Sequence, residues 1–401
     1  MQRPPAPIPQ IAPGAPEKLA IIDLQAIRSN VRRIRQLIGQ RTLIAVVKAN
    51  AYGHGAVQVS RAALEAGADM LGLAHVSEAL ELRQAGITAS MLAWAHTINT
   101  DFEAALVQDI QLGCSGWDLE AIAGAAQASG RTAAIHLKID TGLGRNGSTA
   151  QEWPALVQRA ASYQDRGLVE VVGIFSHLAV ADQPERQETD QQLDQFAKAV
   201  GMARELGLSP QHLHIANTPA TLTAASKKDP AALLGNGVRV GLGLYGLSPL
   251  ADVTPQELGL KPAMTLQTFV NHVKEVPAGQ GVSYGLNYRT DRPTTLALIP
   301  VGYADGIPRL AGGGPVRIYP RADQARTYQE VGRIAMDQMV VDLGAPGLAD
   351  PALGYLGAPA VLFGQDDNPP VQAWAQACGT INYEIVTGIS NRVQRVYTNH
   401  S

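Results

Sequence analysis

The sequence predicts a closed barrel of eight parallel β-strands, followed by a second, mostly β domain. From about residue 42 to 245, eight short apolar or β-branched runs alternate with helix-like stretches. Eight strand–helix units in one stretch of chain are typical of a (β/α)₈ barrel of the TIM type. A doubly wound sheet is the competing fold, but no G-x-G-x-x-G motif follows the first run. Past residue 250, prolines and glycines become frequent and helical periodicity fades, which predicts the second domain.

The elements of the barrel can be read in order. The predicted strands are LIAVVK (43–48), MLGLAHV (70–76), MLAWAH (91–96), IQLGCS (110–115), AAIHLKID (133–140), VEVVGIFSH (169–177), HLHIAN (212–217) and GVRVG (237–241). Among the helical stretches, residues 56–67 stop at Gly67, residues 118–130 begin at Asp118 as a candidate N-cap, and residues 186–207 stop at Gly207. Before the barrel, KLAIID (18–23) leads into a helix. One face of that helix carries Leu24, Ile27, Val31, Ile34 and Leu37.

The second domain is predicted from strand-like runs separated by turns. These runs are TLQTFVNHVKEV (265–276), TTLALIPVGY (294–303), PVRIYP (315–320), RIAMDQMVVDL (333–343) and APAVLFG (358–364). The stretch from Val371 onward adds a helix. We therefore predict a Pro-rich flexible tail at 1–17, the barrel at 18–251 and the β domain at 252–401.

Composition narrows the class of protein. The net charge is −3 and no basic block occurs, so nucleic acid is not an expected partner. Cys114 and Cys378 are the two cysteines, too few for a disulfide framework, and neither has the spacing of a metal ligand. No apolar run approaches the ~20 residues that cross a bilayer, and the N-terminus lacks a signal core. A cytoplasmic enzyme without a metal is the expectation.

Polar residues recur where the predicted strands end. Lys48 closes the first apolar run, where burial would lower the pKa of its amine and make it a nucleophile or base. If Lys48 were the only polar residue at a strand end, a lysine whose ammonium extends into solvent would be the better interpretation. Other strand ends carry polar side chains as well, namely Lys138, Asp140, His177, Asn217, Thr218 and Arg239. Because each group costs free energy to bury unless it is paired or wet, the set predicts a site at the carboxyl rim of the barrel.

The loops after the seventh and eighth strands are the usual phosphate seat of such barrels. Here they are HIANTPATL (214–222) and RVGLGLYG (239–246). Asn217 and Thr218 offer side-chain donors at a helix start, and Gly241 allows close backbone approach. A phosphate seat and a lysine are the two attachments that pyridoxal phosphate needs. Taken alone, RVGLG is equally consistent with an ordinary β–α turn.

Longer motifs carry a resemblance to a known family. VVKANAYGHG (46–55) resembles the pyridoxal-phosphate lysine segment of bacterial alanine racemases. Further similar motifs follow in the family's order: HLKIDTGLGRNG, FSHLAVAD, HIANT, VRVGLGLYGL, LKPAMTLQT, VKEVPAGQGVSYG, VGYADGIPR, GRIAMDQMVVDLG and GTINYEI. The resemblance runs from about residue 18 to the C-terminus. It implies a homodimeric enzyme that interconverts L- and D-alanine with two bases and pyridoxal phosphate.

The resemblance also implies catalytic roles. Lys48 would form the Schiff base (internal aldimine) with the coenzyme and act as one base. Tyr284, in VSYG, would be the other base and would enter the site from the partner subunit. His177 would hydrogen-bond Tyr284 and tune it. Arg239 would face the pyridine nitrogen, supported by His214.

Binding roles follow in the same way. The residues expected to hold the cofactor are Lys48, Tyr52, Arg145, His177, Asn217, Thr218, Arg239, Gly241, Leu242 and Tyr383. The substrate carboxylate would meet Arg145, Tyr303 and the backbone N–H of Met336, and a carbamate on Lys138 would orient Arg145. Some positions depart from the family pattern: Thr218 stands where serine is common, Ala335 where cysteine is frequent, and Leu143 and Asn146 where methionine and leucine often occur.

General chemistry supports this two-base scheme but does not exclude other functions. Two opposed bases can remove an α-proton from one face and return one to the other, and a tyrosine that titrates near ~10 needs a stabilising neighbourhood to do so. An arginine at the pyridine nitrogen disfavours its protonation. The alternatives are a related racemase of serine or another small amino acid, a pyridoxal-phosphate decarboxylase of related fold, a non-catalytic cofactor carrier, and a barrel without cofactor. Supply of D-alanine for peptidoglycan and alanine catabolism are both open.

Overall fold

A computed structural model describes residues 16–226, 229–321 and 324–399. Most of the predicted tail at 1–17 lies outside these residues. Contacts divide the chain into two compact units, which we call the barrel unit and the sheet unit. The barrel unit comprises residues 26–51 and 55–261. The sheet unit comprises the described residues up to Gln25, residues 52–54, and the chain from Pro262 onward.

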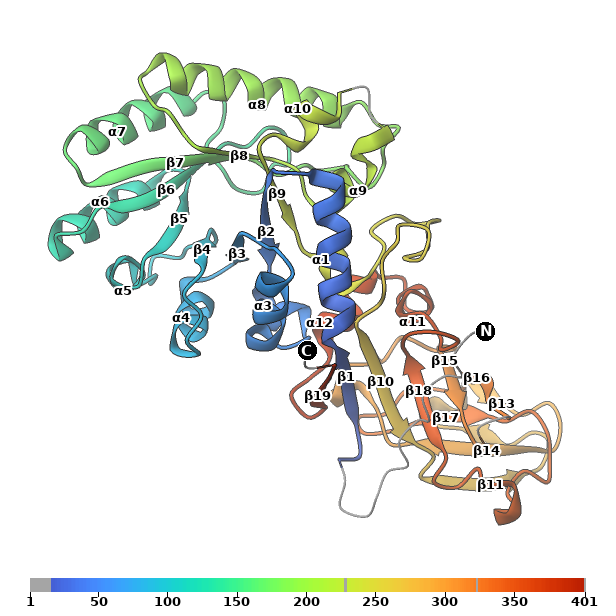
Figure 1. Ribbon diagram of the computed structural model, residues 1–401. Helices are drawn as coiled ribbons and strands as arrows, with labels where there is room; N and C mark the ends of the chain where they lie inside the picture. The colour runs from blue at the N-terminus through green and yellow to red at the C-terminus, as the bar shows by residue number, and fades with distance from the viewer. Residues whose placement is uncertain (1–15, 227–228, 322–323, 400–401) are drawn as a thin grey trace. The chain divides into compact units, whose positions relative to one another are not determined.

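The predicted barrel is confirmed (Figure 1). Its strands are parallel and pair in chain order, and the first closes against the last with Thr42 opposite Gly237. The strands are β2 (Thr42–Val46), β3 (Met70–Leu73), β4 (Ser90–Ala93), β5 (Ile110–Cys114), β6 (Ala133–Lys138), β7 (Val169–Phe175), β8 (His212–His214) and β9 (Gly237–Val240). Because all strands run the same way, their carboxyl ends share one rim, and this geometry brings the predicted polar residues together.

Helices connect and cover the strands. They are α1 (Leu24–Ile38), α3 (Ala56–Glu65), α4 (Val76–Gln84), α5 (Phe102–Val107), α6 (Trp117–Ser129), α7 (Trp153–Asp165), α8 (Glu188–Glu205), α9 (Thr218–Thr223) and α10 (Pro230–Leu234). On α1 the predicted apolar face holds, except that Ile38 is buried and Leu37 is only half-buried. The expected N-cap Asp118 is wrong: Gly116 precedes α6, and the Asp118 carboxylate accepts from the N–H groups of Ser115 and Gly116, each at 2.9 Å.

The barrel interior is packed. Trp94 is partly buried and packs against the cluster of Ile44, Met70 and Leu92. Gly72 makes room for this indole, since a Cβ at that position would lie 2.7 Å from it. Polar groups at the rim therefore stand on a rigid, apolar floor.

Among its described residues, the sheet unit has a large sheet of nine strands in the order β11-β14-β17-β16-β15-β18-β10-β1-β19. They are β1 (Leu19–Asp23), β10 (Met264–Phe269), β11 (His272–Val276), β14 (Thr294–Ile299), β15 (Pro315–Ile318), β16 (Arg326–Glu330), β17 (Met339–Asp342), β18 (Pro359–Phe363) and β19 (Gln394–Thr398). A small pair, β12 (Gly281–Val282) and β13 (Tyr288–Arg289), stands apart, and α11 (Val371–Ala377) and α12 (Asn382–Gly388) precede β19.

Four details of this unit differ from the predictions. The strand β1, which we assigned to the barrel domain, pairs instead with β10 and β19. The polar strand β16 was not predicted. Residues 333–338, predicted as strand, form a loop before β17, and the C-terminal stretch holds two helices rather than one.

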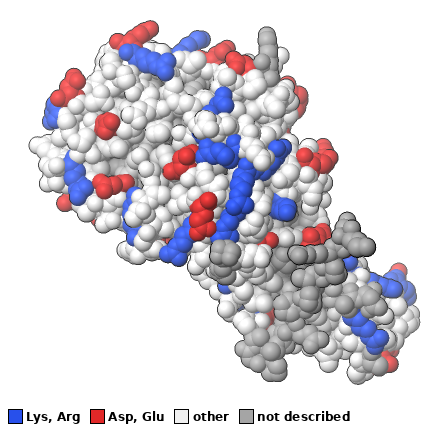
Figure 2. Space-filling view, viewed as in Figure 1, with Lys and Arg blue, Asp and Glu red and all other residues white. Residues whose placement is uncertain are grey.

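Surface charge is mixed. On the face in Figure 2, basic side chains gather over α1, and acidic side chains stand beside them and elsewhere on the barrel. Within the part of the chain that the structure describes, no helix has the length and apolar character to cross a membrane.

Candidate active site

Lys48 lies just after β2 at the carboxyl rim and is half-buried. Burial lowers the pKa of its amine most strongly, and the positive charges of Arg145 and Arg239 lower it further, against an opposing effect of Glu78. A lysine with a lowered pKa is neutral more often near pH 7. The structure therefore has a lysine of lowered pKa at the position where the sequence predicted a nucleophilic amine, and the nucleophilic role itself stays a prediction.

The chain turns in an unexpected way after Lys48. Ala49, Asn50, Ala51 and Tyr52 all have positive φ, between 51° and 54°, so the turn is left-handed. Such a conformation costs roughly 1–2 kcal/mol per non-glycine residue and needs support from its surroundings. Glu78 accepts from the Ala49 N–H at 2.7 Å, and the Asn50 side chain accepts from the Ala56 N–H at 2.8 Å. The sequence predicted only a glycine-containing turn here.

Arg239, in β9, is a buried cation whose two terminal nitrogens donate hydrogen bonds to the protein. It donates to His214 Nδ1 at 2.7 Å, to the His214 carbonyl at 2.7 Å and to the Ser176 carbonyl at 2.6 Å. A longer bond of 3.3 Å reaches His177 Nδ1. Burial lowers the pKa of Arg239 to about 9. The expected contact between Arg239 and His214 is present.

A chain of hydrogen bonds fixes the tautomers of two buried histidines. A guanidinium can only donate, so His214 Nδ1 accepts and its Nε2 carries the proton. That Nε2–H donates to His136 Nδ1 at 2.9 Å, and His136 Nε2–H donates to Gln111 Oε1 at 2.8 Å. Burial lowers the pKa of His136 to about 3 and that of His214 well below its ordinary value, so both rings are neutral.

His136 and Gln111 were missed from the sequence. A signal for His136 was present in HLKID, because strand alternation puts His136 on the same face as Lys138. His177 is neutral as well: burial first, then Arg239 and Arg145, lowers its pKa to about 3. Its predicted bond to Tyr284 stays a prediction.

Lys138, the last residue of β6, is almost fully buried. Burial, followed by Arg239 and Arg145, lowers its pKa to about 8. Its amine donates to the side chain of Asn146, which connects Lys138 to the loop that carries Arg145. Arg145 itself is exposed.

The two glycine- and hydroxyl-bearing loops lie on neighbouring strands, since β8 pairs with β9 and β9 with β2. The Thr218 hydroxyl accepts from the Gly241 N–H at 3.1 Å. The Asn217 side-chain oxygen accepts from the Ala220 N–H at 3.3 Å and caps α9. This cap does not use the N–H₂ group that was expected to donate. The Thr218 O–H proton can still be donated to another acceptor.

Four predicted site residues belong to the sheet unit, and they form two pairs: Tyr52 with Tyr383, and Tyr303 with Met336. Tyr52 and Tyr383 have ring centroids 6.3 Å apart, and burial raises the pKa of Tyr52 to about 12. Tyr303 and Met336 stand on two segments joined by backbone hydrogen bonds, and both side chains are exposed.

Tyr284 is 69% exposed. It lies in a short 3₁₀ turn (Tyr284–Leu286) rather than in a strand. The preceding Ser283 donates its hydroxyl to the Arg333 carbonyl at 2.5 Å, which links this turn to the loop that leads to Met336.

The fold and the rim residues define an α/β-barrel enzyme whose barrel is joined to an antiparallel-rich sheet unit. The chain belongs to the alanine racemase family, as the sequence predicted. Residues 22–249 match the family model "Alanine racemase, N-terminal domain", and residues 263–397 match "Alanine racemase, C-terminal domain".

Individual relatives agree over nearly the whole chain. The chain is 45% identical to the alanine racemase of Beutenbergia cavernae over 383 residues, covering 94% of this chain and 97% of the relative. Among solved structures, the alanine racemase of Streptomyces lavendulae has 47% identity and a TM-score of 0.90, covering 96% of this chain and 98% of the other. That of Streptomyces coelicolor has 43% identity, the same TM-score and the same coverage.

Proposed function

We propose that this protein interconverts L-alanine and D-alanine with pyridoxal phosphate as cofactor. The proposal is supported by family membership and by one observation above all. On the contiguous strands β2, β9 and β8, the rim combines a lysine of lowered pKa, a buried guanidinium and a hydroxyl–glycine loop. A racemase of serine or another small amino acid is the alternative that stays open.

The donor set at the rim fits this cofactor. The Lys48 amine suits an aldehyde, and the Thr218 hydroxyl with the backbone amides near Gly241 suits a phosphate. We propose that the cofactor is held by Lys48, Tyr52, Arg145, His177, Asn217, Thr218, Arg239, Gly241, Leu242 and Tyr383. Pyridoxal phosphate, when bound, supplies a carbonyl for the substrate amine and an electron sink that makes the α-hydrogen acidic.

Arg239 would set the strength of that sink. Its guanidinium has five donors and no acceptor, so a ring nitrogen that faces it stays unprotonated. His214 holds the guanidinium in place from the side and His177 contacts it less closely. Arg239 would thus favour return of the proton over other outcomes at the α-carbon.

Lys48 and Tyr284 would move the proton. Lys48, whose amine is neutral more often than that of an ordinary lysine, takes or returns a proton on one face of the α-carbon. The Tyr284 phenol acts on the other face. Arg145, Tyr303 and the Met336 N–H would hold the substrate carboxylate, which fixes the α-carbon between the two bases.

Tyr284 would enter the site from a second copy of the chain. The exposed apolar residues of the sheet unit support such an interface, because Tyr284 is 69%, Met336 52% and Leu286 50% exposed. Exposed large apolar side chains are a feature of surfaces that a partner covers. A homodimer with shared sites is therefore part of the proposal. The cytoplasmic location expected from the sequence stays a prediction.

Incubation of the purified protein with L-alanine and pyridoxal phosphate in deuterated water tests the function. We expect D-alanine that carries deuterium at the α-carbon. A parallel incubation with L-serine shows whether the protein also accepts this amino acid. The Lys48→Ala variant is the control, because it measures any conversion that does not depend on Lys48. Carbon dioxide release from lysine, ornithine or arginine, with no alanine conversion, would instead favour the decarboxylase alternative.

A further inference from the structure

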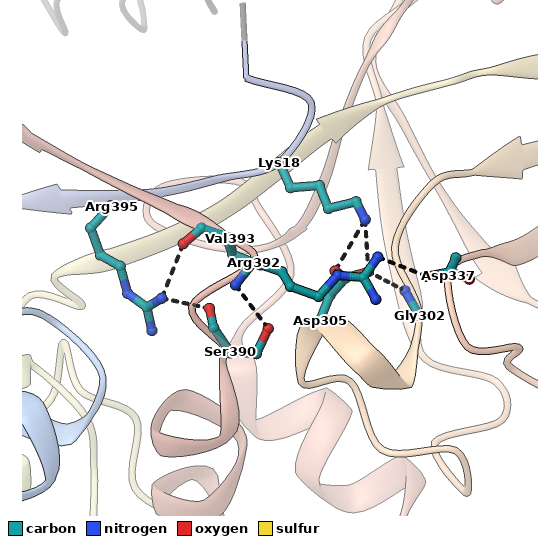
Figure 3. Close-up of polar contacts among 8 residues, drawn as sticks. All are labelled: Lys18, Gly302, Asp305, Asp337, Ser390, Arg392, Val393 and Arg395. Atoms are coloured by element: carbon teal, nitrogen blue, oxygen red, sulfur yellow. Dashed lines mark hydrogen bonds and ion pairs between the residues drawn. The ribbon is translucent and has the colours of Figure 1, made fainter.

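A cluster of four charged side chains lies within the sheet unit beside the predicted carboxylate pocket. Its members are Lys18, Asp305, Asp337 and Arg392 (Figure 3). We propose that Arg392 is a positioning residue that holds the Tyr303 turn and the Met336 loop in the arrangement that binds the substrate carboxylate. This inference rests on the proposed function, because it assigns a device to the pocket of that same site.

Asp305 is the centre of the cluster. Its side chain is fully buried, and both carboxylate oxygens accept from Lys18 Nζ at 3.0 Å. One oxygen also accepts from the Gly302 N–H at 3.0 Å, and the other lies 3.3 Å from Arg392 Nε. A buried carboxylate is costly unless it is paired and hydrogen-bonded, so these partners fix the turn that contains Asp305. Tyr303 belongs to this turn (Tyr303–Asp305).

The Tyr303 turn is held against the Met336 loop through the backbone. The Tyr303 N–H donates to the Ala335 carbonyl at 3.0 Å, and the Ala304 N–H donates to the Met336 carbonyl at 2.9 Å. Gly302 is required for this approach, because a Cβ there would lie 2.3 Å from the Ala335 carbonyl oxygen. The two groups expected to meet the substrate carboxylate therefore depend on one pair of segments.

Arg392 joins the same two segments through side chains. Its Nε faces Asp305 and its Nη2 donates to Asp337 at 2.7 Å, so one guanidinium spans the residue after Ala304 and the residue after Met336. The cluster contains two cations and two anions, so it is electrically balanced. Lysine offers a single ammonium and cannot reproduce a planar fork with two separated donors.

The segment that carries Arg392 is itself anchored. Arg395 donates to the carbonyls of Ile389 at 2.5 Å, Ser390 at 2.6 Å and Val393 at 3.0 Å, and it also reaches the Gly53 carbonyl at 3.0 Å (Figure 3 shows the bonds to Ser390 and Val393). The Ser390 N–H donates to the Asp305 carbonyl at 3.0 Å. Arg392 therefore projects from a fixed turn, as a positioning residue must.

Loss of Arg392 leaves Asp305 with Lys18, so the fold of the turn survives while the bridge to Asp337 is lost. Since a misplacement of about 1 Å in a positioning group can cost up to about 100-fold, we expect Arg392→Met to raise KM for alanine at least about fivefold and to change kcat less than about threefold. The KM of Arg392→Lys for alanine should lie between that of Arg392→Met and that of the wild type. Asp337→Asn removes the charge of the exposed partner of Arg392, and it should raise KM for alanine about two- to fivefold.

The test compares these variants with Arg292→Met, which removes an exposed arginine paired with Asp291 in the same unit and away from the cluster. KM and kcat are measured for alanine, and calorimetry measures binding of propanoate, a carboxylate that needs no turnover. Weaker propanoate binding by Arg392→Met and Asp337→Asn, with Arg292→Met like wild type, supports the proposal.

Unchanged KM and propanoate affinity in both cluster variants would overturn it, and so would a loss confined to kcat. Failure of the proposed function is distinct, because it shows as a wild-type protein that does not racemise alanine. In that case the propanoate measurement still tests the positioning role. If the wild-type protein binds propanoate and Arg392→Met does not, the carboxylate pocket is supported. If the wild-type protein does not bind propanoate, both proposals are overturned.

Discussion

At the residue scale, Lys138 links burial to pH dependence. Its pKa is about 8 in the folded protein and 10.5 ordinarily, so between these values the unfolded chain binds more protons. The stability contributed by this residue therefore rises as pH increases from 8 to 10.5. We expect Lys138→Met to flatten that rise and to increase the free energy of unfolding at pH 7 by roughly 1–3 kcal/mol, measured by urea titration in carbon-dioxide-free buffer.

The same lowered pKa bears on the predicted carbamate. With a pKa of about 8, about a tenth of the Lys138 amine is neutral at pH 7, and only a neutral amine can react with carbon dioxide. Bicarbonate should therefore change the pH dependence of wild-type stability and leave that of Lys138→Met unchanged. Identical responses of the two proteins to bicarbonate would contradict the carbamate.

The histidine chain gives a second residue-scale prediction. Gln111→Leu removes the acceptor of the buried His136 N–H, and an unsatisfied buried donor costs about 1–3 kcal/mol. We expect the free energy of unfolding to fall by roughly that amount. Gln108→Leu, at an exposed position nearby in the chain, is the matched control and should change it by less than about 0.5 kcal/mol. Equal effects of both substitutions would argue against the chain of bonds.

Sequence reasoning at this scale located Lys48 and Arg239, because each ends or lies in a strand with a clear pattern, whereas His214 was named only from the family resemblance. It missed His136 and Gln111, because their roles depend on a pairing between side chains of different strands. It did not foresee that the Asn217 side-chain oxygen caps α9, while the donor role expected of its N–H₂ group stays a prediction. Spacing predicts which residues share a rim, but the direction of a hydrogen bond depends on the neighbours.

At the element scale, the left-handed turn after Lys48 can be compared with an ordinary helix by replacing one alanine in each with glycine. Glycine adopts positive φ without steric cost, so Ala49→Gly should leave stability unchanged or raise it by up to about 1 kcal/mol. Ala121→Gly, in the ordinary helix α6, should lower stability by about 1 kcal/mol. Denaturant titration measures both, and an equal loss in the two variants would contradict the strain assigned to the turn.

Element prediction followed local pattern and failed where pattern was weak. The barrel strands are continuous apolar runs and were found, whereas β16 is polar along most of its length and was missed. Residues 333–338 looked strand-like but form a loop, because the Tyr303 turn takes up their carbonyls. Nothing in an alanine-rich segment predicts four consecutive residues with positive φ.

At the scale of the whole molecule, subunit mixing tests the shared site. Lys48→Ala and Tyr284→Phe should each be nearly inactive as homodimers. A mixed dimer would pair the intact Lys48 of one chain with the intact Tyr284 of the other. Random mixing makes about half of the dimers mixed, with one intact site in two, so we expect about a quarter of wild-type activity to return after co-refolding. Activity that stays at the level of the separate variants would mean that both residues act within one chain.

The sequence predicted the two-part organisation, because composition and periodicity change together near residue 250. It could not predict that β1 belongs to the sheet. LAIID is a plain strand signal, and its partners β10 and β19 lie far away along the chain. Long-range pairing of this kind is decided by packing, which local pattern does not record.

That pairing has a consequence for synthesis of the protein. The ribosome makes β1 near the start of the chain and β19 near its end, yet Leu19–Asp23 runs parallel to Gln394–Thr398 in the finished sheet. Until translation reaches those last residues, one edge of β1 has nothing to pair with, and unpaired edges recruit other chains. A premature stop codon just before Gln394 should therefore yield an aggregating product, although every residue at the barrel rim would still be encoded.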